Sequence, residues 1–349
     1  MSIRSGKVQT VLGMIDPGEL GHTQTHEHLL VVLIPPEGRS KFPPDEPIRM
    51  ETLGKLRMFK ADPDELGLIS NVAKLDSEAD AIDEMQRYRA AGGGTVVDAT
   101  SIGIGRNPRG LARISQESGV HVVMGAAYYE AAYHPQDTLK LDESALAERI
   151  VRDIVDGADD TGICAGLIGE IGLGWPVKPA ESRVLAAGAR AQRETGAPVM
   201  IHPGRFPDAP LEAVRAFEKA GGDPTRMIMA HIDRTLFSLD AMKELAATGC
   251  MIEFDLFGQE SSYYPFAPID MPNDAMRIDY LIGLFDAGYG SQLVIAQDIC
   301  MKTHLTRYGG ESYSHILETV LPMMDRKGLG QDQIRTICVE NPQRILAFG

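Results

Sequence analysis

The feature that most constrains the fold is a regular alternation of short apolar runs with stretches of helical pattern. The intervening stretches, such as LDSEADAIDEMQRYRAAGG and AESRVLAAGARAQRETGA, place apolar or alanine residues at helical spacing and end at glycine. Strands that alternate with helices form parallel sheets through right-handed crossovers. Eight apolar runs are present, at residues 25–33, 94–100, 121–127, 166–172, 198–204, 227–233, 250–256 and 293–299.

Eight strand–helix units favour a closed barrel over an open, doubly wound sheet. An open sheet that binds nucleotides would need a glycine loop after an early strand, whereas the glycines of GGGTVV precede their strand. The predicted fold class is therefore α/β, a (β/α)8 TIM barrel. The 349 residues are expected to form one domain, residues 1–349, because barrels of this type often reach that length as a single unit.

Three further segments are predicted around the barrel. Residues 7–21 predict an N-terminal β-hairpin that turns at residues 16–18 (DPG) and caps the bottom of the barrel. Long loops are expected after strand 1, over residues 34–90, and after strand 7, over residues 257–278; the first opens with the proline-rich PPEGRSKFPPDEP. The final ENPQRILAF is expected to form a helix that closes the barrel.

Charge and composition exclude several classes of partner. The formal net charge of −15 repels phosphates and anionic lipids, so neither nucleic acid nor membrane is expected, and a small-molecule substrate is. No run approaches the roughly 20 apolar residues of a membrane span, and the first ten residues resemble no signal peptide. The four cysteines lie apart without a CxxC pair, which favours reduced thiols. These observations predict a cytoplasmic protein.

Six potential metal ligands fall at or near the carboxyl ends of five predicted strands, where barrel enzymes place their reactive groups. Imidazole and carboxylate are the usual ligands of zinc and related divalent metals. A lone histidine on a strand is more often structural, but the joint pattern HxH, Glu, His, His, Asp predicts a metal site. The predicted metal ligands are His26, His28, Glu170, His202, His231 and Asp298.

This pattern, with its flanking motifs, resembles the phosphotriesterase family of the amidohydrolase superfamily. The likeness is greatest to the phosphotriesterase-related branch, in which a bridging glutamate stands in place of the carboxylated lysine of many members. The matching motifs span nearly the whole chain: VLGMIDPGELGHTQTHEHL, GAAYYEAAYHP, GEIG, AHIDRT, EFDLFGQE, AQDICMKTHLTRYGGESYSHIL and ENPQRIL.

The resemblance implies a binuclear metal-dependent hydrolase. Two divalent ions, zinc first with manganese, cobalt or iron as alternatives, would share a hydroxide that attacks the substrate. Glu170 would bridge the ions. In the family's arrangement the buried ion is held by two histidines and an aspartate, and the more exposed ion by two histidines. Here these sets are His26, His28 and Asp298 for the buried ion, and His202 and His231 for the exposed one. The family also suggests a homodimer.

Other roles follow from the same resemblance. Asp298 would be both ligand and catalytic general base, with a role as ligand only left open. Asp233 would take a proton from Asp298 or orient a ligand, unless it is a solvated loop residue. Family members place an aromatic side chain beside the leaving group, so Tyr129 and Tyr128 are candidates for substrate binding; Tyr129 is favoured, and core packing is the alternative. Glu27 should point away from the barrel axis.

The substrate is less constrained. Lactonase-like members carry an arginine in an LDRYG-type motif after the seventh strand, whereas this chain has FDLFG with Leu256 at that place. The expected reactions are cleavage of a carboxylic ester, a lactone or an N-acyl amide, with weak phosphotriesterase activity. The alternatives are a phosphotriester hydrolase proper, a non-catalytic metal-containing binding protein, and a one-metal lyase or isomerase that uses Glu253 as its acid–base group. Glu253 and Asp255 could instead form a packed salt bridge.

Overall fold

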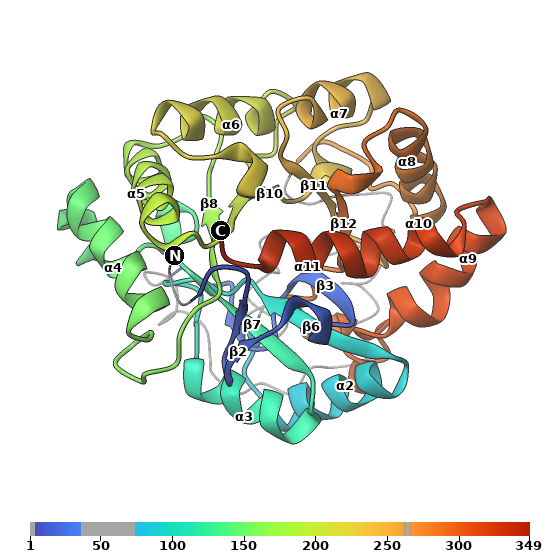
Figure 1. The fold of residues 1–349 in the computed structure, drawn as a ribbon, viewed down its shortest axis with the longest axis horizontal. Coiled ribbons are helices and arrows are strands. Elements are labelled where there is room, and N and C mark those ends of the chain that lie inside the picture. The colour runs from blue at the N-terminus through green and yellow to red at the C-terminus, as the bar shows by residue number, and fades with distance from the viewer. Residues whose placement is uncertain (1–3, 36–73, 261–263, 265–266) are drawn as a thin grey trace.

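Eight parallel strands form one sheet at the centre of the computed structural model, which describes residues 4–35, 74–260, 264 and 267–349. The strands follow one another around the sheet in chain order, so the predicted barrel is confirmed (Figure 1). They are β3 (His22–Glu27), β6 (Gly93–Asp98), β7 (His121–Ala126), β8 (Leu167–Gly172), β9 (Val199–His202), β10 (Met227–Met229), β11 (Met251–Phe254) and β12 (Leu293–Ile295).

The two end strands of this sheet, β3 and β12, meet and close the barrel. The backbone N–H of Asp298 donates to the carbonyl of His26 at 3.2 Å. Beside this bond, the buried carboxylate of Glu27 accepts from the backbone N–H groups of Gln297 at 2.8 Å and Ile299 at 2.9 Å. Glu27 therefore fastens the chain after β12 to the end of β3, which agrees with the predicted structural position.

A helix follows each strand and covers the outside of the barrel, as the repeating sequence pattern predicts (Figure 1). The apolar faces of these helices and the outward-facing strand residues form the larger hydrophobic core. The eight helices are α2 (Glu78–Ala90), α3 (Pro108–Ser118), α4 (Glu143–Val155), α5 (Pro179–Thr195), α6 (Ala209–Lys219), α7 (Leu239–Ala246), α8 (Asp274–Asp286) and α9 (Leu321–Lys327).

Local capping chemistry fixes where the helices begin and end. At α3, the Asn107 side chain accepts from Gly110 N, Pro108 occupies the first turn, and Gly119 ends the helix at φ 72°. A glycine suits that last position because an L side chain is disfavoured at positive φ. Side-chain caps of the same kind begin α2, α4, α7 and α8, at Ser77, Asp142, Ser238 and Asn273.

The predicted N-terminal hairpin is present, but its turn lies elsewhere. Strands β1 (Val8–Thr10) and β2 (Gly13–Ile15) pair antiparallel, so the chain reverses between Thr10 and Gly13 and not at residues 16–18. The reason is that Pro17 begins a short 3-10 helix, η1 (Pro17–Glu19), in which the Glu19 carboxylate accepts from Asp16 N at 2.9 Å. Proline is well suited to the first turn of a helix.

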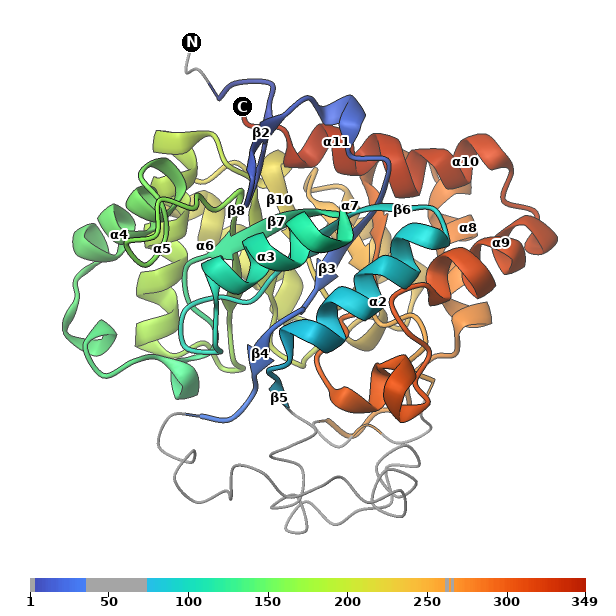
Figure 2. The same cartoon turned by 90° about the horizontal axis from the view of Figure 1, so that it is seen from below.

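A second hydrophobic core fills the end of the barrel at which both chain termini lie, and the two ends of the chain cover it. Helix α10 (Gln331–Arg335), a π-helical segment (Thr336–Glu340) and α11 (Asn341–Leu346) cross the face that also carries the hairpin (Figures 1 and 2). The predicted terminal helix therefore closes the barrel. This core consists of Val8, Leu20, Val97, Ala99, Val123, Leu167, Met200, Ile228, Ala230, Met251, Val294, Ile345 and Leu346.

The loops after strands 1 and 7 are described only in part. The predicted first strand, 25–33, is interrupted: β3 ends at Glu27, and β4 (Val31–Val32) pairs antiparallel with β5 (Lys74–Leu75). The proline-rich start of the first loop lies outside the described residues, and α2 occupies the end of the predicted 34–90 segment. Most of the second loop, up to Asp274 where α8 begins, is irregular where it is described.

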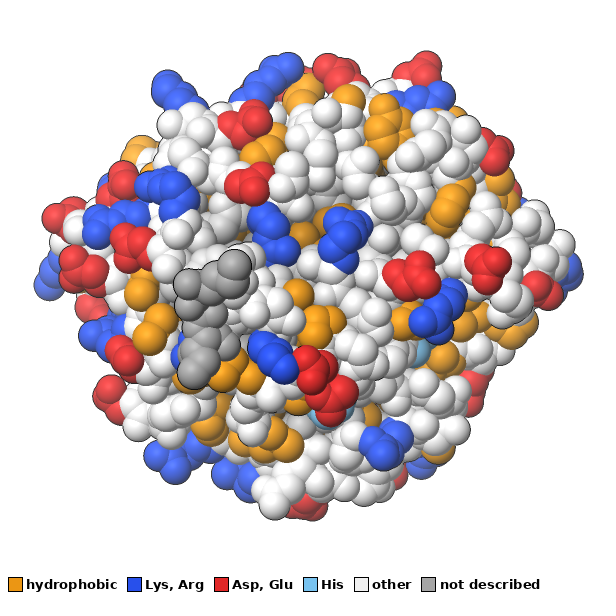
Figure 3. Space-filling view, in the orientation of Figure 1, with side chains coloured by type: hydrophobic (Ala, Val, Ile, Leu, Met, Phe, Trp, Pro, Cys, Tyr) orange, Lys and Arg blue, Asp and Glu red, His pale blue; other side chains and the backbone are white. Residues whose placement is uncertain are grey.

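The face seen in Figure 3 carries charges of both signs, and the thiols agree with the expectation of unpaired cysteines. Acidic and basic side chains are interspersed over the face that carries the termini (Figure 3). Among the described helices, none combines the length and apolar character that crossing a bilayer requires. The four cysteines are unpaired as predicted, although Cys164 is only partly buried, whereas Cys250, Cys300 and Cys338 are buried.

We expect Ile345→Ala to lower the free energy of unfolding by about 2–5 kcal/mol, because it leaves a cavity in the second hydrophobic core. Ile345 is fully buried, whereas Leu12 in the hairpin turn is 56% exposed. The control Leu12→Ala should change the free energy by no more than about 0.5 kcal/mol. Urea denaturation followed by circular dichroism measures both, and equal effects of the two substitutions would contradict a sealing role for α11.

Candidate metal centre

All six predicted ligands lie at the carboxyl end of the barrel, in or just beyond its strands. His26 lies in β3, Glu170 in β8, and His202 is the last residue of β9. The other three ligands follow a strand by one to three residues: His28 after β3, His231 after β10 and Asp298 after β12. The closed barrel therefore brings residues that are up to 272 positions apart in sequence (26 to 298) to one place.

Two of these residues are held in left-handed backbone conformations. The φ angle is 57° at His231 and 48° at Asp298. Histidine and aspartate tolerate this region better than most side chains, but it still carries strain of about 1–3 kcal/mol, which native structures concentrate at functional sites. The surrounding hydrogen bonds hold both residues there: Asp255 accepts from His231 N at 2.9 Å, and His26 O accepts from Asp298 N.

The carboxylate of Glu170 lies among all four histidines. Its Oε2 is 2.9 Å from His202 Nδ1 and 3.6 Å from both His26 Nε2 and His231 Nε2, and its Oε1 is 3.5 Å from His28 Nε2. A carboxylate so placed can contribute one oxygen to each of two adjacent cations. This is the arrangement that the sequence predicts for a bridging glutamate.

Among the described residues, ligand atoms converge in three groups, of which two contain only predicted ligands and the third combines His26, His231 and Asp255. Of the first two, one comprises His26, His28 and Asp298, and the other comprises Glu170, His202 and His231. In the first group Asp298 Oδ1 lies 3.2 Å from His28 Nε2 and 3.8 Å from His26 Nε2. In the second, His231 Nε2 lies 2.8 Å from His202 Nδ1. These two groups coincide with the two ligand sets that the resemblance implies.

Three of the histidines are oriented by contacts to their other ring nitrogen. Nδ1 of His231 lies 2.8 Å from Asp255 Oδ1, and Nδ1 of His26 lies 3.1 Å from Asp255 Oδ2. Nδ1 of His28 lies 2.9 Å from the hydroxyl of Thr100. Such contacts fix the tautomer that leaves Nε2 free, and they make the imidazole a better metal ligand. Asp255 serves one histidine of each group.

The electrostatics of the cluster favour added positive charge. Burial alone lowers the pKa of His26, yet the charge of Glu170 and a hydrogen bond to Asp255 raise the pKa well above its ordinary value. Burial raises the pKa of Glu170, but the charges of His26 and His202 hold it well below its ordinary value. The pKa of Asp298 is lowered in the same way, by a hydrogen bond from His28 against the effect of burial. The carboxylates of Glu170 and Asp298 are therefore ionised, and bound cations would balance their negative charge.

The donor set fits two divalent ions. Nε2 of His26 is buried and forms no hydrogen bond with the described residues, although it faces Glu170 and Asp298. A buried ring nitrogen without a partner is costly unless something binds it. Imidazole nitrogens with carboxylate oxygens are the donors that zinc, manganese, cobalt and iron accept. Divalent ions would also balance the negative charge of Glu170 that now raises the pKa of His26.

The two candidate tyrosines point in different directions. The hydroxyl of Tyr129 lies 3.4 Å from His202 Nδ1, and its ring packs edge-on against that imidazole. Tyr128 instead packs against His134, and Arg149 lies over its ring. Consecutive residues at a strand end face opposite sides, so only Tyr129 stays a candidate for substrate contact. Tyr128 occupies the core packing position that the sequence left open.

Asp233 lies behind the cluster and is not a solvated loop residue. Its Oδ2 forms a buried ion pair with Arg277 Nε at 2.7 Å and accepts from Leu256 N at 3.1 Å. Burial raises the pKa of Asp233 to about 6 despite the opposing charge of Arg277. These contacts anchor the loop that follows β10. Among the contacts formed by the described residues, Asp233 has none with Asp298, which gives no support to direct proton transfer between them.

Glu253 and Asp255 both lie beneath His26. Glu253 Oε2 is 3.4 Å from His26 Nδ1, its side chain is fully buried, and burial raises its pKa to about 7. Neither residue faces an open space where a substrate could bind. The packed alternative therefore describes them better, with the difference that their partners are the candidate ligands His26 and His231.

Sequence reasoning does not identify three charged residues that lie beside His202. Arg234 Nη2 lies 3.2 Å and Glu130 Oε1 lies 3.5 Å from His202 Nε2, and Arg205 Nη1 pairs with Glu130 at 3.0 Å. Each follows a strand end: Glu130 after β7, Arg205 after β9 and Arg234 after β10. A charged residue shortly after a predicted strand is the sequence feature by which these three residues could be found.

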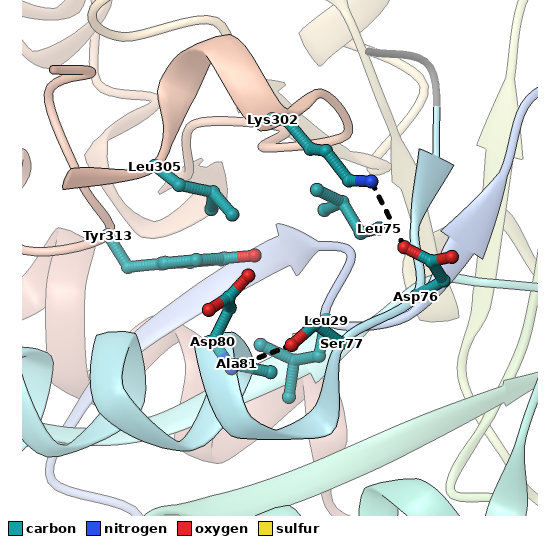
Figure 4. A pocket seen from close by; sticks show the side chains of 9 residues that line it. All are labelled: Leu29, Leu75, Asp76, Ser77, Asp80, Ala81, Lys302, Leu305 and Tyr313. Atoms are coloured by element: carbon teal, nitrogen blue, oxygen red, sulfur yellow. Dashed lines mark hydrogen bonds and ion pairs between the residues drawn. The ribbon is translucent and has the colours of Figure 1, made fainter. Parts of the chain in front are cut away.

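A small hollow lies next to the segment that follows His28, but it is separate from the cluster. In Figure 4, Lys302 points toward Asp76, and Ser77 caps α2 near Asp80. None of the six predicted ligands lines it, and its charged groups already have partners, so it offers no reactive group. The lining residues are Leu29, Leu75, Asp76, Ser77, Asp80, Ala81, Lys302, Leu305 and Tyr313.

Comparison with known proteins identifies the family to which this geometry belongs. The profile of the phosphotriesterase family matches residues 6–346. The chain belongs to the phosphotriesterase family. The prediction of a metal-dependent hydrolase is thereby confirmed at the level of the family, and the His, Asp and Glu groups described above are capable of holding the metal.

Similar relatives and structures extend over the full barrel. An N-acetyltaurine hydrolase from Salmo salar is 42% identical, with all of both chains aligned. A crystal structure of a resiniferatoxin-binding protein from Rhodobacter sphaeroides is 34% identical, has a TM-score of 0.89, and covers 99% of this chain and 96% of its own. A phosphotriesterase homology protein from Escherichia coli, solved with phosphate in its active site, is 27% identical with a TM-score of 0.77, covering 95% of this chain and 100% of its own.

We expect Asp255→Asn to weaken metal retention about 10–100-fold, because the amide cannot accept hydrogen bonds from both His26 and His231 as the carboxylate does. The matched control is Asp240→Asn on α7, since the Asp240 side chain is 97% exposed. Metal content after dialysis against graded chelator, measured by plasma mass spectrometry, gives the affinities. Retention by the Asp255 variant that equals the control would contradict the orienting role.

Proposed function

We propose that this chain is a binuclear metal-dependent amidohydrolase that cleaves N-acyl amides of small acidic amines, with N-acetyltaurine as the first candidate substrate. The observation that carries the proposal is the position of Glu170, whose two oxygens lie within 3.6 Å of the inward-facing nitrogens of four histidines. That geometry suits two cations that share one carboxylate. His26, His28 and Asp298 would hold one ion, and His202 and His231 the other.

When bound, two such ions lower the pKa of water from about 15.7 to near 7, supply hydroxide at neutral pH and polarise a carbonyl oxygen. The residues of this chain position the reaction. Asp298 is ionised, since hydrogen bonding from His28 lowers its pKa, and it faces the ring nitrogens of both groups. It is therefore placed to accept the proton of the attacking water and return it to the leaving nitrogen as general base and then acid.

Tyr129 and the barrel closure support this chemistry from two sides. The Tyr129 hydroxyl, beside His202, is placed to donate to the substrate carbonyl or to the leaving group. Burial raises the pKa of Tyr129 well above its ordinary value, so the hydroxyl keeps its proton at neutral pH. Glu27 holds the backbone on both sides of Asp298, which fixes the direction of the base.

The substrate assignment rests on the relatives and on one departure from the lactonase pattern. Relatives at 40–42% identity over their full length are N-acetyltaurine hydrolases, including the human protein. Leu256 stands where lactonase-like members carry arginine, and it is buried. We therefore place amides ahead of lactones and esters, and we infer only weak phosphotriester hydrolysis. The six ligand side chains and the base are all present, which speaks against a purely binding protein.

We further infer that the two ions are zinc and that the chain acts as a single-domain homodimer in the cytoplasm. Zinc is the first choice because the donor set contains four imidazoles. Metal analysis of protein purified without added metal and multi-angle light scattering test the first two inferences.

Removal of the metal should abolish the activity, since hydroxide would no longer form at neutral pH. Protein loaded with zinc is assayed by release of taurine from N-acetyltaurine, then treated with chelator and reloaded. We expect loss of at least about 1,000-fold in kcat and recovery on reloading. Amide cleavage that persists in metal-free protein would overturn the metal-dependent mechanism. Incorporation of solvent oxygen into the acetate separates hydrolysis from a lyase reaction.

Substitution of the base gives a separate test. We expect Asp298→Asn to lower kcat about 10²–10⁴-fold, the usual contribution of a general acid–base group, and to weaken metal retention as well. Glu318→Gln on the outer π-helical segment (Ile316–Val320) serves as control, since Glu318 lies away from the cluster. A variant that binds two metals and turns over at the normal rate would show that Asp298 is neither ligand nor base.

A further inference from the structure

Arg234 is a buried cation that has no carboxylate partner in the part of the chain that the structure describes. Its residue is 3% exposed, and among the described residues no carboxylate lies within ion-pair distance of its guanidinium. Its nitrogens contact only neutral groups: Thr235 Oγ1 at 3.2 Å, Pro203 O at 3.4 Å and His202 Nε2 at 3.2 Å. Buried arginines are usually paired, because an unpaired charge away from water costs several kcal/mol.

The contact of Arg234 with His202 also favours a hydrogen-bond acceptor beside these two groups. Nδ1 of His202 faces Glu170 and His231, so it is the nitrogen that would bind metal, and Nε2 then carries the proton. In the structure Nε2 can accept from Arg234 Nη2 at 3.2 Å, and with a metal on Nδ1 the two atoms would become facing donors. Two donors at this distance require an acceptor between or beside them. Glu130 Oε1 is 3.5 Å from Nε2, which is long for a hydrogen bond.

A second arginine adds to the positive charge. Arg205 pairs with Glu130 at 3.0 Å and donates to the hydroxyl of Tyr264 at 3.1 Å. The pKa of Arg234 is lowered by its burial and by the like charge of Arg205, while Glu130 is ionised with its pKa lowered to about 2 by His202 and Arg205 against the effect of burial. Two guanidinium groups thus lie beside the carboxylate of Glu130, and the charge of Asp255 also acts on Arg234.

We propose that Arg234, assisted by Arg205, binds the anionic group at the far end of the substrate, a sulfonate or a carboxylate, and so selects acidic N-acyl amides. The proposal rests on the proposed amidohydrolase function. It places the anion on the side of His202 opposite to the metal-facing Nδ1, so the width of one imidazole ring separates it from the reacting carbonyl. An amide nitrogen followed by two methylenes, as in N-acetyltaurine, provides a spacer of that order.

The fork geometry of guanidinium fits both candidate anions, because each presents two or more oxygens in one plane. With metal on His202 Nδ1, an oxygen of the anion would accept from both Arg234 Nη2 and His202 Nε2, and so would satisfy the two donors. A neutral substrate would leave these buried donors unsatisfied. Discrimination against neutral amides follows from this cost, as well as from attraction of the anion.

The test measures discrimination as a ratio. The metal-loaded unaltered protein and the variants Arg234→Gln, Arg205→Gln and Arg234→Lys are assayed with N-acetyltaurine and with the neutral ester 4-nitrophenyl acetate. We expect Arg234→Gln to lower the ratio of kcat/KM for the anionic amide to that for the neutral ester by about 100-fold, mainly through KM. Arg205→Gln should lower it less, and Arg234→Lys should restore part of it. Arg87→Gln, an exposed residue on α2, is the control.

A merely structural role for Arg234 would lower both reactions together and leave the ratio unchanged, and that result would overturn the proposal. Metal content is measured for each variant, so that loss of metal through His202 is not taken for loss of anion binding.

Failure of the amidohydrolase function itself is distinguished by direct binding. If the unaltered protein cleaves the ester but no amide, calorimetric titration with propane-1-sulfonate and with butyrate still tests the anion site. Binding of either anion that is lost in Arg234→Gln supports the site and leaves only the reaction to be reassigned. Absence of binding of both anions to the metal-loaded unaltered protein would overturn the proposal. Preference for one of the two anions would decide between sulfonate and carboxylate substrates.

Discussion

The junction of β3 and β12 is the contact on which the site depends. These strands come from opposite ends of the chain, and backbone hydrogen bonds together with the buried Glu27 carboxylate join them. Because Glu27 stands between His26 and His28, the residue that closes the barrel also fixes the two imidazoles on either side. Its carboxylate oxygens also hold the backbone on both sides of Asp298, at Gln297 and Ile299. The contacts that close the barrel therefore also position His26, His28 and Asp298, the candidate ligands of one ion.

The centre is built in layers of opposite charge below the open face of the barrel. Glu253 and Asp255 lie deepest, the imidazoles rest on them, and Glu170 and Asp298 face the imidazoles from the other side. Each layer is buried, so the interactions between layers are stronger than they would be in water. Arg234 and Arg205 lie beside His202 and add positive charge next to the candidate metal ligands.

Much of this architecture could be predicted from the sequence, and the misses have physical causes. The alternation of strands and helices predicts the barrel, and histidines and acids at strand ends predict the ligand cluster. Both predictions rest on periodic patterns that a sequence displays directly. The hairpin turn was misplaced because Asp-Pro-Gly also begins a 3-10 helix. The direction of Tyr128 and the partner of Asp233 depend on packing between distant segments, which no local pattern records. The position of Arg234 after a strand end is a weak signal, because an arginine in a loop is ordinarily solvated, and its burial is visible only in the structure.

Asp255 has a consequence for how the centre is assembled. One of its oxygens contacts His231 and the other contacts His26, and the family resemblance assigns these histidines to different ligand sets. An ion that orders one imidazole therefore also orders the carboxylate that orients the other. Occupation of the first position lowers the conformational cost of filling the second, which is positive cooperativity transmitted through a single side chain. If two ions bind in this way, we expect the mononuclear form to be disfavoured relative to the empty and doubly loaded forms.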